Sequence, residues 1–222
     1  MQPPHGPAVD RQVLVPAGRA TLEGLLTVPE AALGVVAFAH GSGSGRHSPR
    51  NLHVARALNG LGLATLLLDL LTAAEETHLG ALRFDVELLG QRLLGAVDWL
   101  VHGEATSHLR LGLFGASTGA AAALRAAAVR DEAIAAVVSR GGRPDLAGSA
   151  LAHVRVPTLL IVGGSDAQVL ELNRAARAQL GGPAELAVIP GAGHLFEEPG
   201  TLDAVARLAG AWFVRYLAPG TT

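Results

Sequence analysis

The most chemically specific pattern in the sequence is Gly115-Ala116-Ser117-Thr118-Gly119. It matches G-x-S-x-G, and it stands between an apolar run typical of a buried strand and an alanine-rich run typical of a helix. Small neighbours leave room for a tight strand-to-helix turn that presents a serine hydroxyl in a strained conformation. The pattern therefore predicts that Ser117 is a nucleophile. The alternative is a glycine-rich start of a helix with an incidental serine.

A serine hydroxyl needs a general base within hydrogen-bond reach. His194 follows the last predicted strand, and the glycines before it let the imidazole turn toward a serine. Asp166 follows another predicted strand and is the expected acid that orients the histidine, so the sequence predicts a Ser-His-Asp triad. Two alternatives are open for the acid. Asp69, at the end of an earlier strand, is the main rival, and Asp166 could serve only as a helix cap.

A Gly/Ser-rich loop that begins His40-Gly41-Ser42 follows a further predicted strand. The main-chain N–H groups of Ser42 and Thr118 are the expected donors of an oxyanion hole, and His40 and Gly41 are expected to lie beside the substrate. Such a loop could instead bind the phosphates of a nucleotide. That interpretation is much weaker, because the Lys-Ser/Thr of a P-loop is missing and the match to G-x-G-x-x-G is poor.

Arg140 stands at the end of another predicted strand, where a guanidinium could bind a substrate carboxylate or carbonyl. A structural role is the favoured alternative, in which Arg140 pairs with Asp145 or with a buried main-chain carbonyl. Arg46, His47 and Arg50 could line the rim of a site near the oxyanion loop.

The elements that would hold these residues alternate along the chain. Apolar patterning predicts strands over 11–16, 21–28, 34–39, 63–68, 109–114, 134–139, 156–163 and 185–189, and helices over 49–61, 82–102, 118–130, 169–180 and 202–217. The first two strands form a hairpin, and the apolar stripe of helix 82–102 is predicted to begin at Phe84. The alternation predicts an α/β fold with a mostly parallel central sheet, an N-terminal antiparallel hairpin and helices on both faces. The carboxyl ends of its strands meet at one edge, where such sheets bind ligands.

Composition indicates one globular domain over residues 1–222, with an irregular tail over residues 1–10. Half of the 222 residues are hydrophobic, 16% are charged and the formal net charge is −2. No basic stripe favours nucleic acid or an anionic membrane, so the expected partner is a small molecule.

The chain has no cysteine, which excludes a disulfide framework, a thiolate metal site and a cysteine nucleophile. The oligomeric state, monomer or homodimer, stays open.

Three features bear on the location of the protein. The absence of cysteine fits a reducing cytoplasm, and the N-terminus lacks the basic and apolar segments of a secretory signal. The apolar runs are far shorter than the ~20 residues that span a bilayer. The expectation is a cytoplasmic protein, and the bias toward Ala, Leu, Arg and Gly is typical of a GC-rich bacterial genome.

With these clusters assembled, the chain resembles the α/β-hydrolase superfamily over nearly its whole length, and most closely the dienelactone hydrolase family. The closer likeness is carried by three stretches, LDLLT at 68–72, SRGGRPD at 139–145 and PGAGHLFEEP at 190–199. The resemblance implies an α/β-hydrolase fold, a serine or cysteine nucleophile with Asp and His, and no metal or organic cofactor. It matches Ser117, Asp166 and His194 in this sequence. Dienelactone hydrolases use a cysteine nucleophile and this chain has a serine, so the family's substrate does not transfer with its name.

The expected reaction is the hydrolysis of short-chain or lactone-type carboxylic esters through an acyl-enzyme intermediate. Only the short segment 140–155 separates two predicted strands where a lid would be inserted, so an open, shallow site is expected. Two alternatives remain. The same residues could run another acyl transfer, as in a thioesterase, peptidase or acyltransferase, or the domain could be a catalytically silent binding module.

Overall fold

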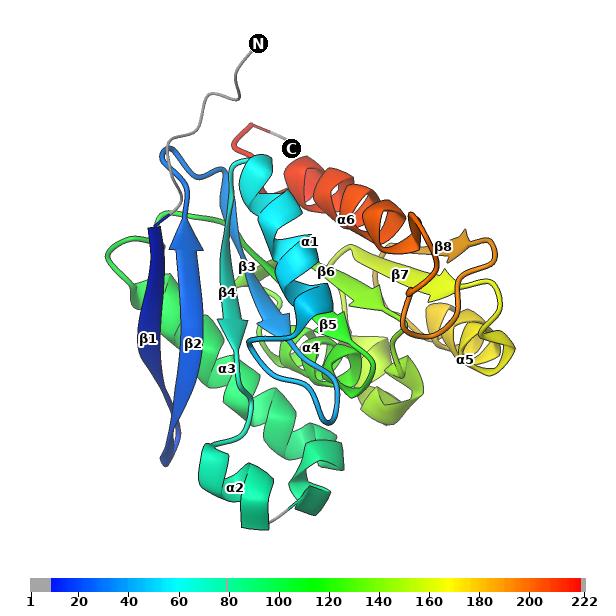
Figure 1. The fold of residues 1–222 in the computed structure, drawn as a ribbon, viewed down its shortest axis with the longest axis horizontal. Helices are drawn as coiled ribbons and strands as arrows, with labels where there is room; N and C mark the ends of the chain where they lie inside the picture. Colours follow the sequence, from blue (N-terminus) through cyan, green and yellow to red (C-terminus); the bar gives the residue numbers. More distant parts are fainter. Residues whose placement is uncertain (1–8, 79, 221–222) are drawn as a thin grey trace.

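The centre of the protein is an eight-stranded sheet with the order β1-β2-β4-β3-β5-β6-β7-β8. A computed structural model describes residues 9–78 and 80–220 (Figure 1). The strands are β1 (Val9–Ala17), β2 (Ala20–Val28), β3 (Gly34–Ala39), β4 (Leu63–Leu68), β5 (Leu111–Ala116), β6 (Ile134–Arg140), β7 (Thr158–Gly163) and β8 (Ala184–Ile189). β2 pairs antiparallel with β1 and β4, and the other neighbours are parallel. The predicted α/β fold with its N-terminal hairpin is confirmed.

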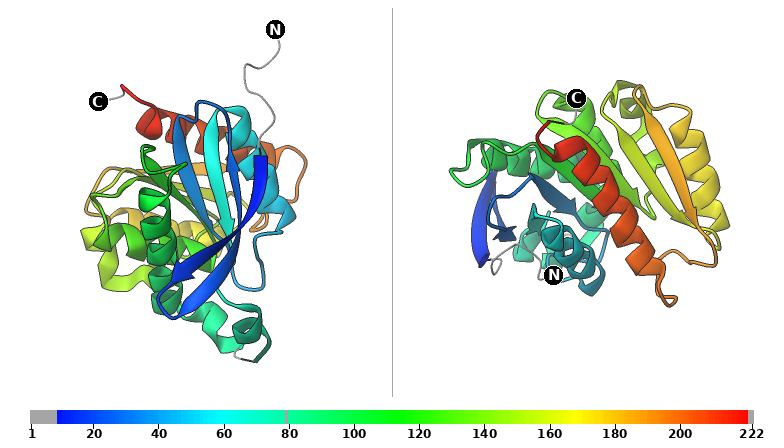
Figure 2. Two further views of the ribbon diagram at one scale, coloured as in Figure 1. Left: turned by 90° about the vertical axis from the view of Figure 1, so that its left-hand side faces the viewer. Right: turned by 90° about the horizontal axis from the view of Figure 1, so that it is seen from above.

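Helices cover both faces of this sheet (Figure 2). They are α1 (Pro49–Gly60), α2 (Ala73–His78), α3 (Val86–His102), α4 (Thr118–Val129), α5 (Ala167–Arg177) and α6 (Thr201–Leu217), with 3-10 elements η1 (Gly80–Phe84) and η2 (Pro144–His153). Buried residues of α1 and α6 pack on one face, and those of α3, α4 and α5 pack on the other. Within the described residues, none of the helices combines the length and apolar character needed to cross a bilayer.

The central strands are buried on both sides, which is why their sequences are continuously apolar and do not alternate. All six residues of β3 are buried. Val35 and Ala37 point into the cluster beneath α3 and α4, whereas Val36 and Phe38 point into the cluster beneath α1 and α6. This strand therefore has a full hydrophobic layer on each face and lies at the middle of the sheet.

The predicted helix over 82–102 is wrong at its start. The structure places Phe84 in η1, where its side chain is 62% exposed, and α3 begins only at Val86. The Asp85 carboxylate accepts a hydrogen bond from the Leu88 N–H at 3.0 Å, which caps the new helix and satisfies one of its free donors. The capping residue, and not the apolar spacing, decides where this helix begins.

Three further segments bear on the predicted boundaries. β1 already includes Val9, within the range 1–10 expected to be an irregular tail, and residues 1–8 of that range lie outside the described residues. α2 was not predicted. The segment between β6 and β7 forms only the ten-residue element η2, which is broken at Gly148 (φ 57°).

Candidate active site

Ser117 occupies a strained turn between β5 and α4. Its backbone has φ 52° and ψ −121°, a conformation that non-glycine residues rarely adopt. The glycines of the motif make this turn sterically feasible. A Cβ atom on Gly119 would lie 2.2 Å from the main-chain oxygen of Ala39, and one on Gly115 would lie 2.4 Å from the Cα of Ala120. The small residues of G-x-S-x-G are thus required by close backbone contacts on both sides of the serine.

His194 and Asp166 form a direct pair. The imidazole Nδ1 lies 2.7 Å from Asp166 Oδ2, and the side chains are 39% and 16% exposed, respectively. Asp166 directly precedes α5 but its side chain makes no capping hydrogen bond, so its carboxylate is committed to the histidine. An Nδ1–H that donates to this carboxylate leaves Nε2 unprotonated and able to accept a proton.

Close backbone contacts bring the loop that contains His194 (residues 190–200, between β8 and α6; the histidine loop) to the ends of β6 and β7. A Cβ on Gly163 would lie 2.3 Å from the Ala192 main-chain oxygen, and one on Gly141 would lie 3.0 Å from the oxygen of His194 and 3.7 Å from its Cε1. The turn of the serine is attached to the same segment, since Ser117 N–H donates to the Arg140 carbonyl at 3.3 Å. Ser117, His194 and Asp166 therefore lie at the same edge of the sheet, where only His194 and Asp166 share a hydrogen bond among the described residues.

The serine hydroxyl itself makes no hydrogen bond within residues 9–78 and 80–220. Nucleophile–base hydrogen bonds are often long or poorly aligned in ligand-free enzymes and tighten only when substrate binds. The hydrogen bond between Ser117 and His194 stays a prediction.

The loop after β3 lies directly against the serine. A Cβ on Gly41 would lie 3.0 Å from Ser117 Cβ, so this glycine leaves room in front of the nucleophile. The next N–H group, that of Ser42, donates to the side-chain hydroxyl of Thr118 at 3.0 Å. Thr118 is buried and is the first residue of α4, so the helix dipole favours negative charge near its amide. The two predicted oxyanion donors are thus brought together, with the threonine hydroxyl bonded to one of them. Sequence reasoning did not anticipate that bond.

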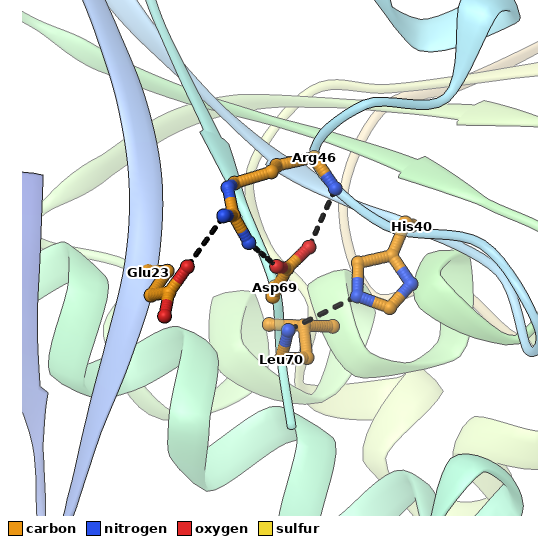
Figure 3. A network of polar contacts seen from close by, with 5 residues as sticks. All are labelled: Glu23, His40, Arg46, Asp69 and Leu70. Carbon is orange, nitrogen blue, oxygen red and sulfur yellow. Dashed lines mark hydrogen bonds and ion pairs between the residues drawn. The ribbon is translucent and has the colours of Figure 1, made fainter. Parts of the chain in front are cut away.

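His40 anchors this loop to the end of β4. Its Nε2 accepts a hydrogen bond from Leu70 N–H at 3.0 Å (Figure 3). Its Nδ1 faces the Gly41 carbonyl at 2.9 Å. The side chain is buried, and both ring nitrogens are engaged by the main chain. This fits a histidine that supports the loop, and contact of His40 with a substrate stays a prediction.

Asp69, the rival for the acid, is bound by Arg46, and among the described residues it has no hydrogen bond or ion pair with His194. Its carboxylate accepts a hydrogen bond from the Arg46 main-chain N–H at 2.6 Å and forms an ion pair with the Arg46 guanidinium, which also pairs with Glu23 (Figure 3). These residues line a cavity of about 350 Å³ together with His40 and residues of the Gly/Ser-rich loop. Arg46 thus ties the oxyanion loop to β2 and β4. The sequence suggested only a place on the rim for it.

Among the described residues, Arg140 has neither partner that the structural alternative offered, Asp145 or a buried main-chain carbonyl. The Asp145 carboxylate is bound by Arg143 through two hydrogen bonds of 2.9 and 2.8 Å. Arg140 is 7% exposed, and its guanidinium carbon lies 5.9 Å from the centre of the Phe196 ring. Burial, together with the smaller effect of the nearby charge of Arg50, lowers the pKa of Arg140 to about 10. The side chain is thus still charged at neutral pH.

Metal ligands do not gather at this edge. Among the described residues, no group of three or more His, Asp or Glu side chains could hold a metal ion. What the edge does assemble is a serine on a tight turn, a His–Asp pair and a loop of main-chain donors.

The strand order and the serine turn define an α/β hydrolase. The model of the dienelactone hydrolase family matches residues 24–213, and the chain belongs to this family. The crystal structure of a dienelactone hydrolase from Anabaena variabilis is 57% identical and superposes with a TM-score of 0.93, covering 95% of this chain and 99% of that chain. The structure of Est1E from Butyrivibrio proteoclasticus, 17% identical with a TM-score of 0.77, covers 91% of this chain and 97% of that chain and shares the fold.

Two curated relatives are named as transferases and not as hydrolases. In two strains of Mycobacterium tuberculosis, proteins named "Putative phosphoribosyl transferase" are 56% identical to this chain over 215 residues. The match covers 96% of this chain but 48% of each relative. The chain therefore spans about half the length of the curated relatives that it matches.

Proposed function

We propose that the protein hydrolyses carboxylic esters, of the short-chain or lactone type, through an acyl-enzyme intermediate on Ser117. The observation that carries this proposal is the His194–Asp166 pair, 2.7 Å apart, at the same sheet edge as the left-handed turn of the serine. Membership of a hydrolase family supports the same reaction class.

In the proposed cycle, Ser117 Oγ attacks the ester carbonyl carbon while His194 Nε2 takes the hydroxyl proton. Asp166 stabilises the imidazolium that forms. The amide of Thr118 receives the negative charge on the carbonyl oxygen, and the amide of Ser42 joins it when its N–H turns from the Thr118 hydroxyl to the substrate. When the tetrahedral intermediate collapses, the imidazolium gives its proton to the leaving alcohol. Water then attacks the acyl-enzyme with His194 as the base, which releases the acid and restores the serine.

The surroundings of the serine favour small or accessible esters. The segment after β6 is a short 3-10 element, so little chain is available to cover the site. Gly41 leaves the space in front of the nucleophile unfilled, where a substrate carbonyl would lie. His40 and Gly41 would form the wall of this space.

The phosphoribosyl transferase name of the mycobacterial relatives belongs to chains about twice as long as the matched region. We assign ester hydrolysis to this chain, because it contains the serine turn and the His–Asp pair. Another acyl transfer on the same residues would be detected as a new ester or amide product when competing alcohols or amines are added.

The decisive experiment is Ser117→Ala assayed with a short-chain p-nitrophenyl ester. Turnover should fall by several orders of magnitude, because loss of the nucleophile disables the whole set of catalytic residues. Ser149→Ala, at an exposed position of η2, is the matched control and should retain full activity. A fluorophosphonate probe should label the wild type and not Ser117→Ala. Full activity of Ser117→Ala would contradict the proposal, and failure of the wild type to react with the probe would indicate a silent module.

A further inference from the structure

The oxyanion loop, which starts at His40, is fastened to the end of β4 at two points. At the first point, the buried His40 ring accepts the Leu70 N–H at 3.0 Å. At the second, the Arg46 main-chain N–H donates to Asp69 Oδ1 at 2.6 Å. Ser42, whose amide is a predicted oxyanion donor, lies between the two points along the chain. The place of this donor is therefore tied to two consecutive residues after β4.

The side chain of Arg46 strengthens the second point. Its guanidinium pairs with Asp69 and with Glu23 of β2, and Figure 3 shows it between the two carboxylates. The Arg46 and Asp69 side chains are 19% and 23% exposed, whereas Glu23 is 57% exposed, so solvent screens the pair with Asp69 less. A Cβ on Gly45 would lie 2.8 Å from Asp69 Oδ1, so the main chain of the loop lies directly against the same carboxylate.

The tip of the loop, residues 41–44, has little else to hold it. Gly43 has φ 72°, and a Cβ there would meet nothing within 4 Å. Among the described residues, one hydrogen bond joins this tip to a residue outside the loop, from the Ser42 N–H to the Thr118 hydroxyl. In the proposed cycle that N–H turns to the substrate, so this bond is lost as the negative charge develops. The two fastening points then decide where the Ser42 amide lies.

We propose that Arg46 is a positioning residue for the proposed hydrolysis. Its guanidinium, bound to Asp69, holds the oxyanion loop where the Ser42 amide can donate to the carbonyl oxygen in the transition state. Arg46 itself does not touch the substrate. Oxyanion donors act at about 3 Å, and misplacement by about 1 Å can cost about 10² in rate. Asp69 thus serves the oxyanion and not the histidine. The positioning role rests on the proposed hydrolysis, whereas the fastening of the loop does not.

Steady-state kinetics test the role in catalysis. Arg46→Ala should lower kcat for a short-chain p-nitrophenyl ester by roughly 10- to 100-fold and leave KM within about threefold, because the Ser42 amide acts in the transition state. Arg46→Lys keeps the charge but cannot bind two carboxylates through a rigid fork. It should lose an intermediate amount, roughly three- to tenfold, and it is expected to fold even if Arg46→Ala does not.

Arg130→Ala is the matched control. Arg130 also joins two carboxylates, those of Asp98 and Glu132, and its side chain is 30% exposed. It directly follows α4 and precedes β6, which places it at the opposite edge of the sheet from the serine. Arg130→Ala should lower the melting temperature about as much as Arg46→Ala and leave kcat unchanged. Equal values of kcat in the two variants, or a loss in Arg46→Ala that appears in KM, would overturn the proposal.

Chemical rescue separates positioning from a general loosening of the fold. Arg46 lines the cavity of about 350 Å³, so a guanidinium ion from solution can reach the space that Arg46→Ala vacates. Millimolar guanidinium chloride, far below denaturing concentrations, should restore part of the kcat of Arg46→Ala, and equal sodium chloride should not. A loosened fold would not recover, because guanidinium weakens folding. Failure of rescue would contradict the positioning role.

Hydrogen exchange tests the fastening without turnover, in the Ser117→Ala background. The amides of Ser42 and Ser44 are both hydrogen-bonded. Adding Arg46→Ala should make them exchange roughly tenfold faster, the equivalent of one hydrogen bond to a charged group, and adding Arg130→Ala should not. Unchanged exchange in the Arg46 variant would overturn the proposal. Faster exchange, in a chain whose parent hydrolyses no ester, would leave the fastening standing and refute the hydrolase function.

Discussion

Replacing Asp166 by asparagine preserves the shape of the side chain and removes the charge that faces His194. In the parent protein the carboxylate lies 2.7 Å from Nδ1 and is 16% exposed. An asparagine can present its NH2 group to Nδ1, which stabilises the tautomer with the proton on Nε2. That tautomer cannot accept the proton of Ser117, and no negative charge remains to stabilise an imidazolium.

The expected loss follows from the geometry of the pair. Opposite charges whose centres lie roughly 4 Å apart near a protein surface interact by about 4 kcal/mol, which corresponds to about 10³ in rate. The tautomer change adds to this, and removal of the carboxylate in other serine hydrolases costs about 10⁴ in kcat. We therefore expect Asp166→Asn to lower kcat for p-nitrophenyl acetate by about 10³ to 10⁴, with KM within about threefold of the parent value, because the lost interaction belongs to the transition state.

The chain offers a matched control. Asp203 faces the imidazole of His53 at 2.8 Å, but this pair joins α1 to α6 at the surface, with side chains 59% and 45% exposed. Asp203→Asn should leave kcat unchanged and alter the free energy of unfolding by at most about 1 kcal/mol. A loss of less than tenfold in Asp166→Asn would refute this reasoning, and an equal loss in Asp69→Asn would reassign the acid to the earlier strand.

Two further substitutions test the serine turn. Thr118→Val removes the hydroxyl that accepts the Ser42 N–H. The Ser42 N–H is then free to bind the oxyanion, so kcat/KM in a steady-state assay should stay at the parent level or rise by up to about fivefold, the equivalent of one neutral hydrogen bond. A hundredfold loss would show that the threonine hydroxyl itself stabilises the oxyanion. Gly119→Ala would place a Cβ 2.2 Å from the oxygen of Ala39, so the free energy of unfolding should fall by about 1–3 kcal/mol in a denaturant titration. Gly60→Ala, where a Cβ meets nothing within 4 Å, should be neutral or stabilising, and equal losses in both variants would contradict the steric argument.

Two central strands, β3 and β4, were predictable from the sequence with the correct ends, whereas β5 begins and ends two residues later than the predicted 109–114. GVVAFA at 34–39 is a continuous apolar run that ends before His40, and LATLLL at 63–68 is an almost wholly apolar run between Gly62 and Asp69. They are β3 and β4 in the structure. Burial on both faces requires that composition, so pattern and structure coincide. Helix 82–102 was less well predicted because Phe84 continues the apolar spacing but lies outside α3, where capping by Asp85 sets the boundary.

Part of the candidate site is equally local in origin. The small residues around Ser117 are needed within one turn of chain, so the motif by itself indicated a strained serine between a strand and a helix, and the structure has that turn. The sequence also predicted that Asp166 and His194 lie at the same edge of the sheet. Each comes shortly after a strand, and the carboxyl ends of parallel strands lie at one edge.

The pairing of charges was decided only by the tertiary structure. Asp69 and Asp166 both follow strands, and the sequence ranks them only weakly, but Arg46 binds the first and leaves the second to His194. Likewise Arg143 takes the carboxylate expected for Arg140. Electrostatic and hydrogen-bond energies depend on distances of a few ångströms between segments far apart along the chain, and those distances exist only once the sheet is assembled. The serine and its turn are thus determined by the sequence, whereas the partners of the acidic and basic side chains around it are determined by the fold.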